Sequence, residues 1–392
     1  MPGITAATVV SAAGHGVQAL WHAVLEGRSA LRRNNLDWCE LPCWIGAVPG
    51  VDDPALARQL GAWDCRNHRL AWLALQDAGF AAALARCKAR LGAHRIGLVL
   101  GTSTGGIRST EEAYSQWRQS MPPQWPASFD WRRTHAIDAL PRFCAEQLGL
   151  QGPMVAISTA CSSSAKVFLT AQRWLDAGLV DAAVVGGVDS LCLSTLQGFD
   201  ALQLLSNEPC RPFDAARSGI SIGEAGGFAL LERDGGAWRL LGGGESSDAW
   251  HMSTPHPQGQ GAQDAMREAL DRAHLQPSDI GYVNAHGTAT PVNDRTEAVA
   301  LSAVFGSHKV PVSSTKGVTG HALGAAGIVE AVVALGALER QMLPPTANLQ
   351  RVDDALAIDI VTAPRPARLR LAMSSNLGFG GSNCTLIFGR AD

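Results

Sequence analysis

Four reactive side chains occur in three stretches that are otherwise rich in small residues. Cys161 lies in TACSSS, His286 lies in NAHGTAT, and Lys316 and His321 lie in STKGVTGHALGAAG. A thiol near imidazoles can act as a nucleophile in covalent catalysis. Alone, each of these residue types is more often structural, as a buried thiol or a hydrogen-bonded histidine. Together they predict a catalytic site assembled from distant parts of the chain.

Cys161 is expected where a strand passes into a helix. Residues 154–158 have the pattern of a short buried strand, and apolar residues recur at helical spacing after Ser162. Ser162 or Ser163 can cap the start of this helix. Unpaired N–H groups and the helix dipole at such a position favour a thiolate. We therefore expect Cys161 to be an activated nucleophile.

The other reactive residues are also expected at strand ends. An apolar strand is expected over residues 280–285, directly before His286, and another strand is expected over residues 310–314, shortly before Lys316. Chemistry in α/β proteins collects at the carboxyl ends of strands. Residues 377–383, LGFGGSN, form a loop whose glycines permit close approach of the backbone. Its N–H groups, near a thiol, would form an oxyanion hole.

The overall composition is that of an ordinary globular protein. The 392 residues are 46% hydrophobic and 17% charged, with a formal net charge of -3, which argues against a broadly basic nucleic-acid-binding surface. Nine scattered cysteines without zinc spacing predict reduced thiols and no metal site. The N-terminus lacks the features of a signal peptide, and the apolar segment 322–338 contains Glu330. We therefore expect a cytoplasmic protein without a membrane span.

Strand and helix patterns alternate in both halves of the chain, which predicts α/β layers with mainly parallel, buried strands. Two local similarities indicate duplication: IGLVLGTST is similar to IGYVNAHGTAT, and AISTACSSS is similar to PVSSTKGVT. We predict an N-terminal half, residues 1–235, that carries the nucleophilic cysteine. The C-terminal half, residues 236–392, would carry both histidines, the lysine and the glycine-rich loop.

Two further segments bear on function. Asp189-Ser190-Leu191 is similar to a phosphopantetheine attachment site, but it follows a buried Val-rich strand within a large chain, so we expect it to be structural. Residues 115–135 are rich in Trp, Pro, Gln and Arg without clear periodicity. They predict a long excursion that packs on the core or on a partner.

Four linked motifs resemble those of a known family. TACSSS, NAHGTATPVNDRTE, STKGVTGHALGAAGIVE and NLGFGGSN occur in the order and spacing of the elongating beta-ketoacyl-ACP synthases, types I and II, of the thiolase superfamily. SGISIGEAGGFALLERD also fits, so the resemblance spans essentially the whole chain. It implies a thiolase-like five-layered fold, αβαβα, with two duplicated halves, usually as a dimer.

The resemblance also implies a reaction, which is a decarboxylative Claisen condensation by an acyltransferase. Cys161 would take an acyl chain from acyl carrier protein as a thioester. His286 and His321 would hydrogen-bond the thioester oxygen of malonyl-ACP while carbon dioxide leaves, and the resulting enolate would attack the acyl thioester. Lys316, paired with Glu330, would orient the cluster. The pathway would be fatty acid, type II polyketide or aryl-polyene biosynthesis.

Other motif residues receive supporting roles from the same resemblance. The backbone N–H groups of Cys161 and Phe379 would form the oxyanion hole, and the Phe379 side chain would be a mobile gate. Thr104 lies where the family shapes the acyl pocket near the dimer interface, and a polar residue there leaves the chain length open. Three more residues are expected to support the site: Thr288, Thr290 and Asn383.

The expected partners follow from the same chemistry. The resemblance implies no resident cofactor, because the phosphopantetheine arm arrives on the carrier protein. Acyl carrier protein is acidic, so we expect a basic rim around the tunnel mouth. The candidates for this rim are Arg66, Arg69, Arg132, Arg133 and Arg211. We expect a homodimer, with a heterodimer that includes a chain-length factor as the alternative.

Three competing classes fit less well. A degradative thiolase needs a second catalytic cysteine near the C-terminus, whereas Cys384 lies inside an apolar strand run. A noncatalytic chain-length factor would lack the nucleophile, and Cys161 is present. A dinucleotide-binding oxidoreductase would carry G-x-G-x-x-G after its first strand, which this sequence does not have.

Overall fold

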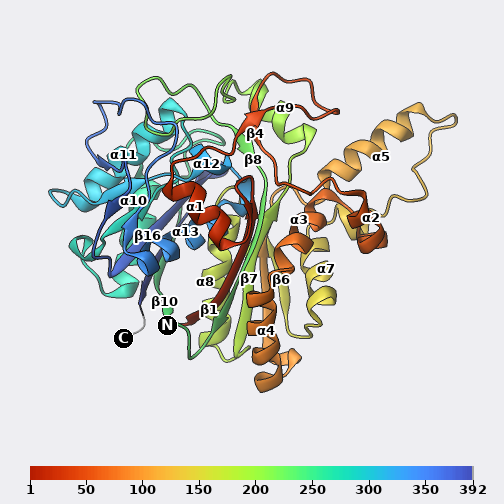
Figure 1. The fold of residues 1–392 in the computed structure, drawn as a ribbon, viewed down its shortest axis with the longest axis horizontal. Coiled ribbons are helices and arrows are strands. Elements are labelled where there is room, and N and C mark those ends of the chain that lie inside the picture. The colour runs from red at the N-terminus through yellow and green to blue at the C-terminus, as the bar shows by residue number, and fades with distance from the viewer. Residues whose placement is uncertain (391–392) are drawn as a thin grey trace.

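The structure is a computed structural model that describes residues 1–390. Most strands belong to one 12-stranded sheet whose two sides come from the two halves of the chain (Figure 1). The first half supplies β1 (Gly3–Ser11), β2 (Gly14–His15), β5 (Ile96–Gly101), β6 (Met154–Ile157), β7 (Ala182–Asp189) and β9 (Ala225–Glu232). The second half supplies β10 (Trp238–Ser247), β11 (Tyr282–Asn284), β12 (Pro311–Ser313), β14 (Asp359–Ile360), β16 (Leu371–Gly378) and β17 (Ser382–Arg390). The strand order is β14-β12-β11-β16-β17-β10-β1-β9-β7-β5-β6, with β2 paired to β1.

The two sides of the sheet meet at a short junction. There β1 and β10 pair antiparallel, with Gly3 opposite Arg239 and Ile4 opposite Trp238. On one side β5 pairs in parallel with β6, and on the other β11 pairs in parallel with β12. The two sides therefore share this arrangement, as expected of duplicated halves. The predicted boundary after residue 235 falls between β9 and β10, but the division into two domains stays a prediction because the sheet is continuous.

Helices cover both faces of each side of the sheet, which gives five layers. Two helices lie between the sides and contact strands of both: α8 (Ser163–Asp176) and α13 (Ala326–Arg340). The outer face of the first side carries α3 (Arg66–Leu75), α4 (Ala78–Leu91) and α7 (Ala139–Leu148), and that of the second side carries α10 (Gln260–Ala273) and α11 (Pro291–Phe305). Figure 1 shows these layers from right to left. The predicted five-layered α/β fold is confirmed.

In the middle layer, α13 is buried on all sides because it packs between two sheet faces. Every residue of α13 from Ala326 to Leu338 is buried. α8 and α13 touch closely, since a Cβ atom at Gly327 would lie 2.4 Å from the backbone nitrogen of Ala165. Within residues 1–390, no helix is both long and apolar enough to cross a membrane.

Shorter elements connect these layers. The remaining helices are α1 (Val17–Leu25), α2 (Pro54–Leu60), α5 (Ile107–Gln119), α6 (Trp131–Thr134), α9 (Leu193–Ala201) and α12 (Lys316–Thr319). The remaining strands form two small sheets, which contain β3 (Arg32–Arg33), β4 (Trp44–Gly46) and β8 (Ile222–Gly223) in one and β13 (Met342–Leu343) and β15 (Arg365–Pro366) in the other.

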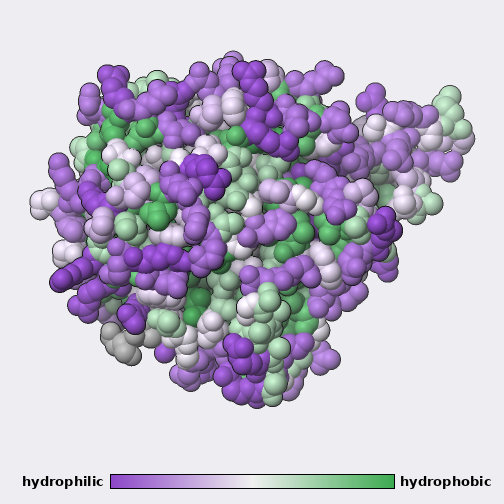
Figure 2. All heavy atoms as spheres, viewed as in Figure 1, coloured by the Kyte–Doolittle hydropathy of each residue, from purple (hydrophilic) through white to green (hydrophobic). Residues whose placement is uncertain are grey.

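Residues 107–134, from α5 to α6, form an arm that projects from the body of the protein (Figure 1). Ala113 is the one buried residue of α5. Aromatic rings on the arm pack on one another instead, with centroids 5.6 Å apart for Tyr114 and Trp117. The excursion predicted over residues 115–135 is therefore present, but its first residues belong to a helix. Figure 2 shows hydrophobic residues scattered among hydrophilic ones over the visible face.

Candidate active site

Cys161 lies between β6 and α8, as predicted, and its side chain is buried. Ala160, just before it, has a φ of 51°, so a sharp turn presents the thiol. The neighbouring serines do not cap the helix. Ser162 and Ser163 instead donate hydroxyl hydrogen bonds to the carbonyl oxygens of Thr159 and Ala160, at 2.9 and 2.6 Å. They fix the turn and leave N–H groups at the start of α8 without a side-chain cap.

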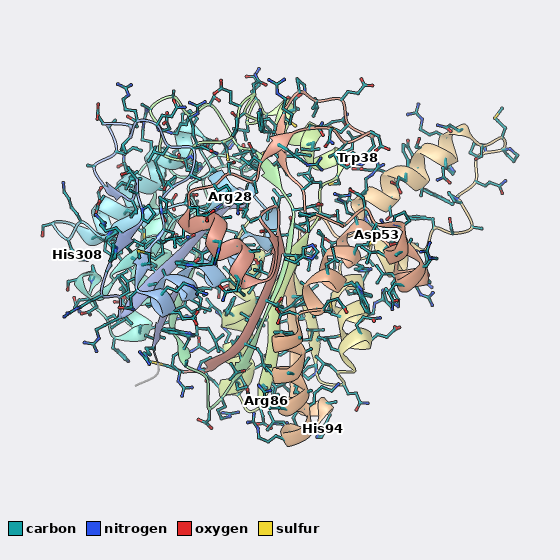
Figure 3. All side chains as sticks on the ribbon, in the orientation of Figure 1. Arg28, Trp38, Asp53, Arg86, His94 and His308 are labelled. Carbon is teal, nitrogen blue, oxygen red and sulfur yellow. The ribbon has the colours of Figure 1, made fainter. Side chains whose placement is uncertain are left out.

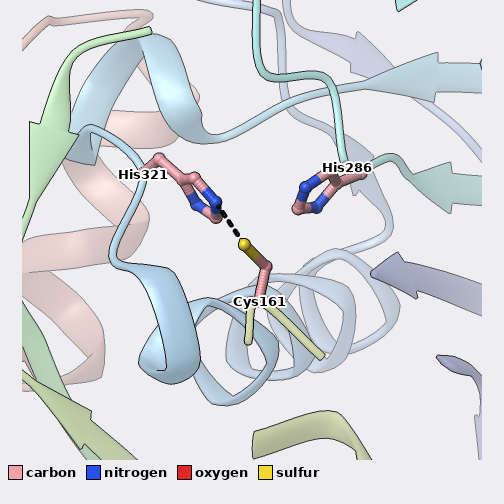
Figure 4. Close-up of side chains that lie close together, drawn as sticks. All are labelled: Cys161, His286 and His321. Carbon is pink, nitrogen blue, oxygen red and sulfur yellow. Dashed lines mark hydrogen bonds between the residues drawn. The ribbon is translucent and has the colours of Figure 1, made fainter. Parts of the chain in front are cut away.

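Two histidines from the second half converge on this thiol (Figure 4). His321 Nε2 lies 2.9 Å from Cys161 Sγ. The rings of His286 and His321 are nearly perpendicular, at 87°, with centroids 5.1 Å apart. One ligand-type atom from each of the three residues lies within 4.8 Å of the other two, so they could also hold a metal ion. The expectation of no metal stays a prediction.

His286 is held in place mainly through its backbone. It follows the end of β11, and the Glu297 carboxylate on α11 accepts hydrogen bonds from the N–H groups of His286 and Gly287, both at 2.7 Å. Burial raises the pKa of Glu297 to about 7. Glu297 was not predicted as a site residue, although it is the last residue of the motif NAHGTATPVNDRTE.

Lys316 links His286 to a buried carboxylate. Its Nζ lies 3.3 Å from His286 Nδ1 and also donates to the His286 carbonyl oxygen. The predicted pair with Glu330 is present, with Nζ 2.5 Å from Oε1, and both side chains are buried. Asn376 donates to the other oxygen of Glu330. A buried charge requires such partners, so this network keeps an ammonium group beside the imidazoles.

The electrostatics differ from the expectation of a thiolate. Burial raises the pKa of the Cys161 thiol to about 12, and it outweighs Lys316 and the Phe379 N–H, which lower this pKa. Burial and then Lys316 hold the pKa of both His286 and His321 well below the usual 6.5. The resting site therefore consists of a neutral thiol and two neutral imidazoles. Burial therefore opposes the effect expected of the helix N-terminus, because a buried thiolate loses its hydration.

The glycine-rich loop brings a backbone donor to the thiol. The backbone N–H group of Phe379 lies near the Cys161 sulfur and acts to lower the pKa of the thiol. Gly378 allows this approach, because a Cβ atom there would lie 3.0 Å from the Thr159 carbonyl oxygen. The Phe379 ring packs on Phe199 of α9, with centroids 5.3 Å apart. The arrangement suits an oxyanion hole and a gate, which both stay predictions.

Asn383 supports this loop at a distance from the thiol. Its side-chain amide donates to Asp248 Oδ1 at 2.7 Å and to Ser246 Oγ at 3.2 Å. Thr288 and Thr290 have hydroxyl oxygens 3.2 Å apart, and Thr290 also caps α11 by accepting from the backbone N–H of Asn293. These three predicted supporting residues thus order the loops around the site.

Two cavities meet at Cys161. The imidazole-side cavity, of about 190 Å³, is lined by residues that include His286, His321, Thr288 and Thr290. The threonine-side cavity, of about 360 Å³, is lined mainly by apolar surface and includes Thr104, Thr195 and Leu323. Three other residues line both cavities: Phe199, Leu202 and Phe379. The thiol is therefore reachable from two directions, with two aromatic rings between them.

Thr104 lines the threonine-side cavity, as predicted, but it does not present a polar group to that cavity. The Thr104 hydroxyl donates to Asp189 Oδ1 at 2.9 Å and accepts from the Ser190 N–H at 3.1 Å. With the hydroxyl occupied, the methyl group is what remains for the cavity. Asp189 and Ser190 are fully buried, which agrees with the structural role expected of that segment.

Five arginines were predicted to form a basic rim, and for Arg66 this prediction is wrong. It is buried, and its guanidinium pairs with Glu224 at 2.7 Å and Asp52 at 2.5 Å, because α3 packs this face into the core. The residues that line the two cavities include none of the five. Arg69 and Arg211 are paired with neighbouring acidic residues. Arg132 and Arg133 are exposed on α6. Carrier contact by these four stays a prediction.

Comparison with known proteins identifies this arrangement. The family model for the beta-ketoacyl synthase N-terminal domain matches residues 57–237, and that for the C-terminal domain matches residues 239–350. The chain is 32% identical to 3-oxoacyl-[acyl-carrier-protein] synthase 2 of Coxiella burnetii, over 99% of this chain and 98% of that protein.

Solved structures agree with this assignment. A chain of the solved complex between the ketosynthase ApeO and its chain length factor ApeC from Xenorhabdus doucetiae has a TM-score of 0.90 and 38% identity, over 100% of this chain and 98% of that one. A beta-ketoacyl synthase from Burkholderia phymatum has a TM-score of 0.88 and 30% identity over 100% and 99% of the two chains. The fold is therefore thiolase-like, as predicted, and the chain belongs to the beta-ketoacyl synthase family.

Proposed function

We propose that the protein is a beta-ketoacyl-ACP synthase, an acyltransferase that condenses malonyl-ACP with an acyl chain held on Cys161. The observation that carries this proposal is the contact of 2.9 Å between His321 Nε2 and Cys161 Sγ, with His286 beside it. The relatives named as 3-oxoacyl-ACP synthases support the same reaction. A role as a degradative thiolase is less well supported, because Cys384 lies within β17 and lines neither of the two cavities that meet at Cys161.

The first step transfers the acyl chain. Cys161 Sγ attacks the thioester carbonyl carbon of acyl-ACP while the thiol proton moves to His321 Nε2. The N–H groups of Cys161 and Phe379 stabilise the oxyanion of the tetrahedral intermediate. Collapse of this intermediate breaks the bond to the phosphopantetheine sulfur, which takes the proton from His321. The products are an acyl thioester on Cys161 and a carrier protein with a free thiol.

The second step forms the carbon–carbon bond. Malonyl-ACP loses carbon dioxide, and the electron pair of the broken bond forms an enolate whose oxygen accepts hydrogen bonds from His286 and His321. Neutral imidazoles suit this role because each carries one N–H donor and no acidic extra proton for the carbanion. The enolate carbon attacks the acyl thioester, the bond to Cys161 Sγ breaks, and Cys161 leaves as a thiolate that takes up a proton from water. The product is a 3-oxoacyl-ACP that is two carbons longer.

The two cavities fit the two substrates of this reaction. The threonine-side cavity has the apolar lining that an acyl chain needs. The imidazole-side cavity contains the groups that act on malonyl-ACP, and its exposed lining residue Val292 marks its outer end. The phosphopantetheine arm would enter there, with no cofactor resident in the enzyme. The nine free cysteines within residues 1–390 support a reducing compartment, so we place the enzyme in the cytoplasm.

We also propose that the enzyme works as a dimer. β6 pairs with β5 and ends the strand order, and Met154 at its start is 46% exposed. An open strand edge accepts a strand from a second subunit. The 38% identical chain belongs to a complex of a ketosynthase with a chain length factor, which favours a heterodimer over a homodimer. Native mass spectrometry after co-expression with a genomic neighbour of the same family would separate the two arrangements.

Intact-protein mass spectrometry tests the proposed reaction. The enzyme is incubated with saturated, unsaturated and aryl-primed acyl-ACPs and then with malonyl-ACP. We expect a mass gain of one acyl group that disappears with malonyl-ACP, and no gain in Cys161→Ala. Acylation of Cys161→Ala at the wild-type rate would refute the proposal. The preferred acyl group distinguishes fatty acid synthesis from a polyketide or aryl-polyene pathway.

A further inference from the structure

α9 forms one wall of the threonine-side cavity, but it has no cap of its own. Thr195 and Phe199 of α9 line this cavity, and Phe199 packs on the gate residue Phe379. The N-cap residue Cys192 makes no side-chain capping bond. Since the first N–H groups of a helix require partners, something else must hold this end of α9.

The partner is a carboxylate from the projecting arm. Glu111 of α5 accepts a hydrogen bond from the Leu193 N–H at 3.0 Å through Oε2 and from the Ser194 N–H at 2.6 Å through Oε1. Both oxygens are therefore used on consecutive N–H groups of α9. A carboxylate at this end also complements the helix dipole. The contact joins residues that are more than 80 positions apart in the chain.

Glu111 is itself held in a fixed position. Arg108, one turn earlier on α5, lies with Nη1 3.5 Å from Glu111 Oε2, and both side chains are about 15% exposed. The Arg108 guanidinium lies over the Trp38 ring, 4.4 Å from its centroid. Trp38 packs against the cluster that contains Leu196 of α9. Figure 3 shows Trp38 beside the base of the arm. The Trp38 ring, Arg108 and Glu111 therefore form one chain of contacts that holds the Glu111 carboxylate.

We propose that Glu111 is a positioning residue that fixes α9 and thereby sets which acyl chains the threonine-side cavity accepts. The proposal rests on the proposed function, in which this cavity holds the acyl chain. A shift of α9 moves Thr195, Phe199 and Leu202 together, and these residues line the cavity and meet the gate. The histidines that act on malonyl-ACP lie on other elements, so we expect decarboxylation to depend on Glu111 much less than acyl-chain selection does, although Phe199 and Leu202 also line the imidazole-side cavity.

The chain offers a matched control in the next residue. Glu112 also pairs with Arg108, with Oε1 2.8 Å from Nη2, but its side chain is 53% exposed and makes no hydrogen bond to α9. Replacing Glu112 therefore removes a charge from the same helix without removing the cap. Glu111→Gln keeps the size of the side chain and one acceptor oxygen, whereas Glu111→Ala removes both acceptors.

The test measures acylation of Cys161 by a series of acyl-ACPs of increasing length, together with decarboxylation of malonyl-ACP. We expect Glu111→Ala to change the ratio of kcat/KM between long and short chains by about tenfold, with a smaller change in Glu111→Gln. Decarboxylation by both variants, and all activities of Glu112→Ala, should stay within about twofold of wild type. An unchanged ratio in Glu111→Ala, or an equal loss in every activity, would overturn the proposal.

Amide hydrogen exchange gives a second readout that needs no turnover. The Leu193 and Ser194 amides should exchange about tenfold faster in Glu111→Gln than in wild type and at the wild-type rate in Glu112→Ala. Equal protection in wild type and Glu111→Gln would contradict the positioning role. If wild-type enzyme is not acylated at all, the proposed function fails, whereas this exchange result still decides whether Glu111 holds α9.

Discussion

The two halves of the sheet use the same pair of parallel strands for different purposes. In the first half, the ends of β5 and β6 lead to Thr104 and Cys161, whose hydroxyl and thiol are neutral. In the second half, the ends of β11 and β12 lead to His286 and Lys316. The two halves therefore share one arrangement of strands but carry different residues at the strand ends. The first half carries the residue that binds the acyl group, and the second half carries the ionisable residues His286 and Lys316.

Burial of ionisable side chains is energetically costly in the second half. A buried ammonium and two buried imidazoles need compensation, and Glu330 and Glu297 supply it through direct contacts with Lys316 and the His286 backbone. In the first half, the buried Asp189 accepts hydrogen bonds from the Thr102–Thr104 turn instead. Acidic residues thus stabilise both sets of strand ends, but Asp189 accepts from neutral donors whereas Glu330 pairs with the buried Lys316.

The largest expected effect separates the two histidines. His286→Ala should lower condensation by on the order of 10²–10³-fold and leave acylation nearly unchanged, because His286 does not contact the thiol. His321→Ala should lower both steps, because His321 Nε2 lies 2.9 Å from Cys161 Sγ. Single-turnover acylation and condensation rates measure each step. Equal effects of the two variants on acylation would remove the distinction.

The protonation state of Cys161 gives a pH-dependent test. Because burial raises its pKa to about 12, the thiolate fraction should rise with pH throughout the range in which the protein is folded. Alkylation by iodoacetamide should therefore increase about tenfold per pH unit from pH 7 to pH 9. The histidines should add no inflection above pH 6.5, since their pKa values are lowered. A rate that is already level between pH 6 and pH 8 would indicate a preformed thiolate.

Removal of one partner from the buried pair should destabilise the second half. Lys316→Ala leaves Glu330 buried without its cation, which should cost roughly 3–5 kcal/mol in free energy of unfolding. Urea denaturation measures this value. Arg28→Ala is the control, because the Arg28–Glu26 pair is at the surface and the two side chains are 57% and 58% exposed. A similar loss of unfolding free energy in both variants would contradict the larger contribution expected of the buried pair.

The smallest expected effect is at Thr104 in the first half. Thr104→Val removes the hydroxyl that serves Asp189 but keeps the shape of the cavity wall. Stability should fall by about 1 kcal/mol, and the preferred acyl chain length should not change. Acylation with the same acyl-ACP series checks the second point. A change in preferred length would show that the hydroxyl contacts the substrate.

The sequence predicts the site best where position depends on local structure. The strand-end placement of Cys161 and His286 follows from short apolar runs, and the duplicated layers follow from alternating patterns. The charge state of the thiol and the burial of Arg66 could not be predicted, because both depend on how distant segments pack. The role of Glu111 could not be predicted for the same reason, because its two hydrogen bonds reach α9, more than 80 residues further along the chain.

The central claim is that each half performs its own chemistry, and malonyl-ACP decarboxylation by Cys161→Ala tests it most directly. Without the nucleophile, the histidines and Lys316 of the second half remain, so the variant should still convert malonyl-ACP to acetyl-ACP. It should make no 3-oxoacyl product when acyl-ACP is added. Loss of decarboxylation in Cys161→Ala, with a folded protein and both histidines in place, would contradict the division between the halves.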